Sequence, residues 1–268
     1  MTRIRYIFLY LLLVFVSTHF VYPADSIPPV IIQRLQGEIV FDGIPDEPAW
    51  QQTESFPFVT HSPVFGNEPE ERTEVRIMFD DKYVYVGAWF YTEDPSKILS
   101  TSKLRDELKP DCDWLGVVLD SYNDNENGMS FWTTPAGLRT DMEVFNDATG
   151  SHRYEPINIS WNTHWDVKTH VNGEGWFVEM LIPASSLRFQ EKDGQVTMGL
   201  ILLRWIPQHN SIYIYPGIPN EFGPFSAWKV SRAQDVVFPG LESRKPLYIT
   251  LYASVGFSQL NELNEAGT

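Results

Sequence analysis

Apolar side chains recur at every second position in many short stretches of this chain, and polar or turn-forming residues separate these stretches. A period of two is typical of β-strands that bury one face. Residues 74–79 and 83–91 flank the polar turn Asp80-Asp81-Lys82 and predict a β-hairpin. Residues 113–120 are apolar on both faces and predict a central strand. Further strands are predicted at residues 130–134, 140–145, 165–171, 176–182, 196–206 and 212–215.

Helices have little support in the same pattern. Residues 95–108 are the best helical candidate, but the segment is short and polar, so we expect one or two surface turns. Residues 51–72 contain several prolines and glycines and are typical of an irregular surface connection. Strands joined by short polar connections favour an all-β fold, an antiparallel β-sandwich, over an α/β fold.

Residues 36–50 open the predicted sandwich. Ile39 and Phe41 alternate with more polar neighbours, as in a half-buried strand, and residues 42–43 then supply a turn. A short helical turn follows and directs Trp50 back toward the strand as an aromatic plug. Turn and capping chemistry accounts for the acidic residues of this segment, so we expect no catalysis by Asp42, Asp46 or Glu47.

The first residues predict export. Residues 1–24 combine a basic start, an apolar run over residues 7–16 and a small residue, Ala24, at the expected cleavage position, as in a secretory signal peptide. Because Tyr22 is bulky where a small residue is preferred, an uncleaved anchor is the alternative. Residues 25–243 then form the predicted sandwich.

Composition narrows the range of partners. The chain has 268 residues, a net charge of −15 and a pI near 4.7, and such an acidic protein is repelled by phosphate backbones, which argues against nucleic acid. Aromatic residues make up 14% of the chain, which favours strands and flat binding faces. Cys112 is the only cysteine, so the chain has no internal disulfide and no thiolate metal cluster.

Residues 120–128 are rich in oxygen ligands and are a candidate site for a structural calcium ion. The helix–loop–helix calcium pattern fails, because its twelfth position is Thr134 and not glutamate. A solvated turn is the alternative. Asp141 and Glu143 share a strand face, and such a carboxylate pair is compatible with glycosidase activity. No zinc motif, nucleophile elbow or phosphate loop is present in the sequence. The sequence favours a protein that is not an enzyme.

Aromatic residues are the stronger functional signal, because a sugar ring stacks its C–H groups on a flat indole while the indole N–H bonds a hydroxyl. Trp114 shares a strand face with Gly116, and a bulky ring beside a glycine leaves space. Either another core ring or a ligand fills that space, and core filling is favoured.

Several segments carry a family resemblance. The sequence motif Asp-Gly-x-x-Asp-Glu-x-x-Trp at residues 42–50 resembles the opening of family 9 carbohydrate-binding modules, which are β-sandwiches. Residues 120–141 and 161–189 are similar to bacterial envelope proteins in which such a sandwich precedes an outer-membrane β-barrel. Residues 247–258 alternate strictly and match the first barrel strand, although an ordinary half-buried strand has the same pattern. The resemblance implies that residues 244–268 begin a truncated barrel region.

The resemblance also implies a location, partners and a site. The expected location is the periplasm or outer membrane of a Gram-negative bacterium, and the expected partners are a carbohydrate and, in addition, an outer-membrane β-barrel. The first ring, the acid and the base of those modules fall at Pro110, Gly116 and near Trp132, so none is retained. The replacement ligand-binding residues that we predict are Trp114, Trp132, Arg139, Asp141 and Trp228.

Non-catalytic carbohydrate binding, in the uptake or breakdown of a polysaccharide, is the favoured function. A structural periplasmic domain that supports or plugs a barrel and binds no sugar is the alternative from a different class. A glycoside hydrolase, or an accessory part of one, is the third.

Overall fold

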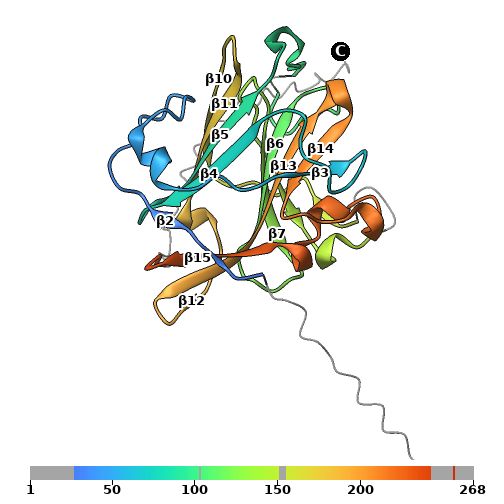
Figure 1. Ribbon diagram of the computed structural model, residues 1–268. Coiled ribbons are helices and arrows are strands. Elements are labelled where there is room, and N and C mark those ends of the chain that lie inside the picture. The colour runs from blue at the N-terminus through green and yellow to red at the C-terminus, as the bar shows by residue number, and fades with distance from the viewer. Residues whose placement is uncertain (1–26, 103, 151–154, 243–255, 257–268) are drawn as a thin grey trace, which may run out of the picture.

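The computed structural model describes residues 27–102, 104–150, 155–242 and 256. These residues form two β-sheets that face each other and are connected by turns and short 3-10 helices (Figure 1). The all-β sandwich predicted from the sequence is confirmed. The predicted signal peptide lies outside the described residues, and so does the segment 247–258 apart from Gly256. No helix in the described part of the chain has the length and apolar character needed to cross a membrane.

The smaller sheet has five strands. In spatial order they are β10 (Asp166–Val171), β11 (Gly175–Pro183), β5 (Tyr83–Tyr91), β4 (Thr73–Phe79) and β2 (Gln33–Arg34). The predicted hairpin is confirmed as β4–β5. Its turn closes because Oδ1 of Asp80 accepts hydrogen bonds from the backbone N–H groups of Lys82 and Tyr83, each at 2.7 Å.

The larger sheet has ten strands. Seven follow one another as β1 (Val30–Ile31), β15 (Gln234–Pro239), β13 (Gln195–Ile206), β6 (Trp114–Asp120), β7 (Gly128–Thr133), β8 (Thr140–Val144) and β9 (Ile157–Asn158). Three more extend the sheet: β12 (Glu191–Lys192) and β14 (Ser211–Tyr215) pair with β13, and β3 (Val59–Ser62) pairs with β14. Since β6 lies between β13 and β7, its prediction as a central strand is confirmed.

The connections contain eight short 3-10 helices among the described residues. They are η1 (Pro48–Gln52), η2 (Pro95–Lys97), η3 (Asn146–Ala148), η4 (Ala184–Ser186), η5 (Pro207–His209), η6 (Asn220–Phe222), η7 (Ser226–Trp228) and η8 (Val230–Arg232).

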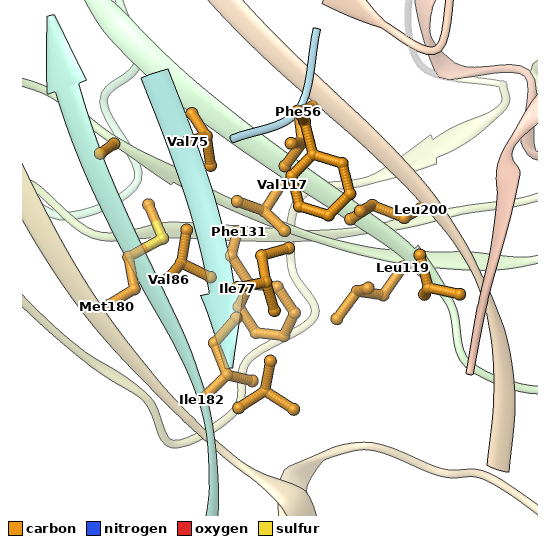
Figure 2. Close-up of a cluster of buried hydrophobic side chains, with 14 of the residues drawn as sticks. Phe56, Val75, Ile77, Val86, Val117, Leu119, Phe131, Met180, Ile182 and Leu200 are labelled. Atoms are coloured by element: carbon orange, nitrogen blue, oxygen red, sulfur yellow. The ribbon is translucent and has the colours of Figure 1, made fainter. Parts of the chain in front are cut away.

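Alternate side chains of both sheets meet in the core between them. Figure 2 shows Val75, Ile77 and Val86 of the smaller sheet beside Val117 and Leu119 of the larger one. Each of these five side chains is at most 1% exposed. Burying one such side chain stabilises the fold by about 1.5–3 kcal/mol, so this layer holds the sheets together.

The outer face of the larger sheet is apolar as well, and it packs against chain segments instead of a third sheet. Val118, Ile201 and Leu203 point away from the inter-sheet core and form a second buried cluster. Helices η7 and η8 contact β13 on this side. Residues 104–113 approach the same sheet, where Leu108 packs against the second cluster. They include Cys112, which is 0% exposed and whose Sγ lies 3.2 Å from the backbone nitrogen of Thr101.

The opening segment differs in part from its prediction. Trp50 is 1% exposed and packs in a cluster with Ile39 and Met78, so the aromatic plug is confirmed. The strand predicted around Ile39 is wrong, because the N–H of Val40 donates to Oε1 of Glu47 (2.6 Å) and not to a neighbouring strand. The Glu47 carboxylate thus accepts the N–H group that a neighbouring strand would have bonded in a sheet.

Two other expectations concern the connections. The surface turn expected within residues 95–108 is confirmed as η2, where the Asp94 carboxylate accepts the N–H of Ser96. The connection 51–72 is not entirely irregular, since β3 within it pairs with β14.

Candidate functional site

The three tryptophans of the predicted site meet on the outer face of the larger sheet. The ring centroids of Trp114 and Trp132 are 4.8 Å apart with an interplanar angle of 80°. Trp228, at the end of η7, lies 5.8 Å from Trp132 at 88°. Residues more than a hundred positions apart therefore form one edge-to-face arrangement of the kind that aromatic pairs prefer.

Gly116 explains how Trp132 fits against the sheet. A Cβ built on Gly116 would lie 2.2 Å from the Trp132 ring, so the ring occupies the space that a side chain would need. Trp132 is 0% exposed. The space predicted beside Trp114 is filled by a core ring, which was the favoured interpretation.

Two aromatic residues that the sequence did not single out extend the group. Trp205 lies directly opposite Trp114 in the β13–β6 pairing, and the two rings are 5.9 Å apart at 27°. Phe225 lies 5.6 Å from Trp228 at 28°. We call Trp114, Trp132, Trp205, Phe225 and Trp228 the tryptophan cluster. The register between β6 and β13 brings Trp205 here, and the sequence alone does not contain that register.

Exposure divides the tryptophan cluster into a floor and a surface. Trp132 is buried, whereas Trp114, Trp205 and Trp228 are each partly exposed. The indole N–H of Trp205 is already used, because it donates to the carbonyl oxygen of Pro110 at 2.8 Å. The partly exposed rings are the part of this face that a ligand can stack on.

Buried polar atoms in the same place have no partner. Among the described residues, no group bonds Nε1 of Trp132, Nε1 of Trp228 or Oγ1 of Thr140, the residue opposite Trp132 in β8. Trp176 in the inter-sheet core shares this property, so an unpartnered indole alone does not indicate a ligand. Unpartnered donors next to partly exposed rings are a more specific combination, because ligand hydroxyls satisfy them.

The structure corrects the prediction for Arg139 and Asp141. Asp141 lies opposite Phe131, whose ring belongs to the inter-sheet core, so Asp141 faces away from the tryptophan cluster. Its carboxylate is 0% exposed, is ion-paired with Arg105 and accepts the N–H of Thr163 at 2.6 Å. The sheet separates this carboxylate from the three tryptophans.

Arg139 is engaged on that other side as well. It donates to the backbone oxygen of Trp165 (2.8 Å) and pairs with Asp166 (3.0 Å). Side chains alternate along a strand, and Arg139 and Asp141 have the opposite parity to Thr140, which lies opposite Trp132. They hold the edge of the sandwich together.

The candidate calcium loop is bonded to itself. The carboxylate of Asp120 accepts the backbone N–H groups of Asp124 (3.1 Å) and Asn125 (2.7 Å). Asp124 accepts those of Glu126 and Asn127, both at 2.8 Å. Within the described residues, no group of three or more His, Cys, Asp or Glu side chains is placed to hold a metal ion. These hydrogen bonds match those of a solvated turn, which was the alternative interpretation of this loop.

A buried charged group at the inner side of the larger sheet was not predicted from the sequence. Arg204 is 1% exposed and pairs with Glu71 at 2.6 Å. Asp113 is 5% exposed and accepts the N–H of Leu99 at 2.8 Å. Burial raises the pKa of Asp113 to about 6, although the charge of Arg204 opposes the shift. An Arg in the middle of an apolar run was the only signal for this group.

Solved structures provide an independent comparison. A family 9 carbohydrate-binding module from Caldicellulosiruptor kristjanssonii in complex with cellotriose is similar to this chain, with a TM-score of 0.53 and 16% sequence identity. The alignment covers 84% of this chain and 100% of that module. The fold is like that of family 9 carbohydrate-binding modules. Neither a scan of protein-family models nor a search of curated proteins finds a match.

Two further solved structures are similar to this chain. The Caldicellulosiruptor kristjanssonii module in complex with glucose gives a TM-score of 0.52 at 16% identity and covers 81% of this chain and 97% of its own. A candidate carbohydrate-binding protein from Bacteroides uniformis gives 0.57 at 11% identity and covers 78% and 98%. Identities this low establish the shared fold.

The contact between Gly116 and Trp132 generates a stability prediction. Gly116→Ala should lower the free energy of unfolding by about 1–3 kcal/mol, because the added methyl group overlaps a ring held on all sides. Urea denaturation measures the loss. Gly173→Ala is the matched control, since a Cβ at Gly173 meets nothing within 4 Å. Combining Gly116→Ala with Trp132→Leu should cost less than the sum of the two single changes; strict additivity would contradict the contact.

The raised pKa of Asp113 generates a pH prediction. The folded state holds the Asp113 proton more tightly than the unfolded chain, so this carboxyl lowers the stability of the fold as pH rises from about 4 to 6. The stability of Asp113→Asn relative to the parent should therefore increase over that window, by at most about 3 kcal/mol. Thermal or urea unfolding at several pH values measures the difference. A difference independent of pH would mean that the pKa of Asp113 is the same in both states.

The bonding of the loop 120–128 predicts that it needs no cation. The Tm of the protein should be the same in calcium and in a chelator, because backbone N–H groups already satisfy the carboxylates of Asp120 and Asp124. A calorimetric scan in each condition tests this. A calcium-dependent rise of several degrees that Asp120→Asn abolishes would show that the loop does bind the ion.

Proposed function

We propose that this chain binds a neutral carbohydrate without catalysis, and that the tryptophan cluster is the binding face. The observation that carries the proposal is the meeting of three partly exposed indoles, Trp114, Trp205 and Trp228, above a buried floor of Trp132. Two of the structures with the same fold contain cellotriose and glucose, which supports the same ligand class.

The physical fit is to a sugar and not to a polyanion or a hydrocarbon. Sugar C–H groups stack on indole faces, and sugar hydroxyls satisfy unpartnered donors such as Nε1 of Trp228. The net charge of −15 repels acidic polymers and leaves neutral glycans as the favoured class. Export to the periplasm or outer membrane is part of the proposal and rests on the predicted signal peptide at residues 1–24.

A second candidate function is favoured by the burial of Trp132. A ring that is 0% exposed and fills the space over Gly116 is a structural element, and the same cluster would stabilise an envelope support domain that binds no sugar. The two functions differ in what the exposed rings do, so exposed positions are the ones to change.

Isothermal titration with soluble cello-, xylo- and manno-oligosaccharides tests the proposal on the chain without residues 1–24. Trp114→Ala should lower the affinity for the oligosaccharide at least tenfold, because one stacking face is lost. The near-ultraviolet spectrum of the variant should still be that of a folded protein. Trp161→Ala is the matched control, since Trp161 is a partly exposed tryptophan that packs against the inter-sheet core. Equal binding by Trp114→Ala, Trp228→Ala and the parent would refute the site, and a parent that binds nothing would favour the structural role.

A further inference from the structure

The outer face of the smaller sheet contains a second cleft, on the side of the sandwich away from the tryptophan cluster. Trp89 and Tyr91 of β5 and Glu74 and Arg76 of β4 point to this face, because their neighbours Val75, Ala88 and Phe90 point into the inter-sheet core. The segment carrying η1 lies along the outer side of β4 and β5 (Figure 1) and closes one wall. The cleft has a volume of about 490 Å³, enough for one or two sugar rings.

Two partly exposed rings form the apolar part of the cleft, and neighbouring groups fix their orientation. The Arg76 guanidinium lies 5.3 Å from the centroid of the Trp89 ring, and that of Arg72 lies 4.5 Å from the Tyr91 ring. Trp50 meets Trp89 edge to face, with centroids 6.0 Å apart at 89°. The rings are therefore held in place before any ligand arrives.

The polar part of the cleft consists of groups whose hydrogen-bonding capacity is only partly used. Arg76 Nη1 donates to the backbone oxygen of Trp50 (2.8 Å), and Glu47 Oε1 accepts the N–H of Val40 (2.6 Å). Arg76 Nη2 donates to Glu74 (3.3 Å), whereas Arg76 Nε and Glu47 Oε2 are buried and have no partner among the described residues. The same is true of Nε1 of Trp50, a residue that lines the cleft and is 1% exposed.

An unbonded buried polar atom costs about 1–3 kcal/mol, so two donors and an acceptor left in one cleft need a partner that both donates and accepts. Hydroxyl groups have that property. The charge of the cleft selects against an anion, because Asp46, Glu47 and Glu74 outnumber Arg72 and Arg76, and Glu74 already pairs with Arg76 at 3.3 Å.

We propose that this cleft is a second saccharide-binding site, specific for neutral sugars, which stack on Trp89 and Tyr91 and bond Trp50, Arg76 and Glu47 through their hydroxyls. The site does not depend on the tryptophan cluster. With sites on opposite outer faces of the sandwich, one chain binds two saccharides and is able to bridge two polysaccharide strands.

Titration of the chain without residues 1–24 against cello-, xylo- and manno-oligosaccharides tests this through the stoichiometry. The parent should bind two saccharides per chain, and Trp89→Ala should bind one. Glu47→Gln replaces the unbonded acceptor by a donor of the same shape and should weaken the second site at least tenfold; it decides the question if Trp89→Ala does not fold. Tyr83→Ala, a partly exposed tyrosine of the same strand outside the cleft, is the matched control.

The side-chain N–H signal of Trp50 in an NMR spectrum, assigned with Trp50→Phe, provides a direct readout and should shift when the sugar is added. A single saccharide that Trp114→Ala removes and Glu47→Gln leaves unchanged would overturn the cleft and keep the first site. A single saccharide with the reverse dependence, together with a shift of Trp50, would keep the cleft and overturn the first site. A parent that binds no member of the panel would overturn both.

Discussion

A sheet that is apolar on both faces has to be covered on both, and this constraint governs the whole molecule. In β6, Val117 points into the inter-sheet core and its neighbour Val118 points outward, and both are 0% exposed. The second sheet covers the inner face. Within the described residues the outer face has no third sheet, so connecting segments lie on it, and the backbone groups of two of them bond within the turns of η7 and η8. Where the connections lie, and which rings they leave partly open, follows from this requirement.

Both sheets meet the requirement with the same device. In the larger sheet the ring of Trp132 lies on Gly116, and in the smaller sheet the ring of Trp50 lies on Gly87, where a Cβ would be 2.8 Å from it. Each buried tryptophan meets a partly exposed one edge to face. In each sheet a buried tryptophan ring thus covers the glycine of a central strand, and this ring contacts a second indole at the surface. The two candidate binding faces thus arise from the way in which the sheets are covered.

The strand pattern made most of this architecture predictable, because alternation is a local property. The hairpin and the central strand needed no knowledge of distant residues. The position of Trp205 did need it, since only the β6–β13 register places that ring beside Trp114. Asp141 was misplaced for a related reason: when both faces of a sheet are apolar, parity within a strand does not reveal which face is the inner one. The prediction of a strand around Ile39 was wrong because the nearby Glu47 carboxylate accepts the backbone N–H of Val40.

The position of Cys112 gives the molecule a built-in reporter. The chain has no other thiol, and this one is fully buried within the segment 104–113 that packs on the larger sheet. A thiol-specific reagent reaches it only when that segment detaches from the sheet, so the labelling rate measures the free energy of this local opening separately from global unfolding. A ligand held by Trp114 and Trp205 would slow the labelling, because Trp205 is bonded to Pro110 of the same segment. The only thiol of the chain thus follows the motion of the candidate binding face without any engineered cysteine.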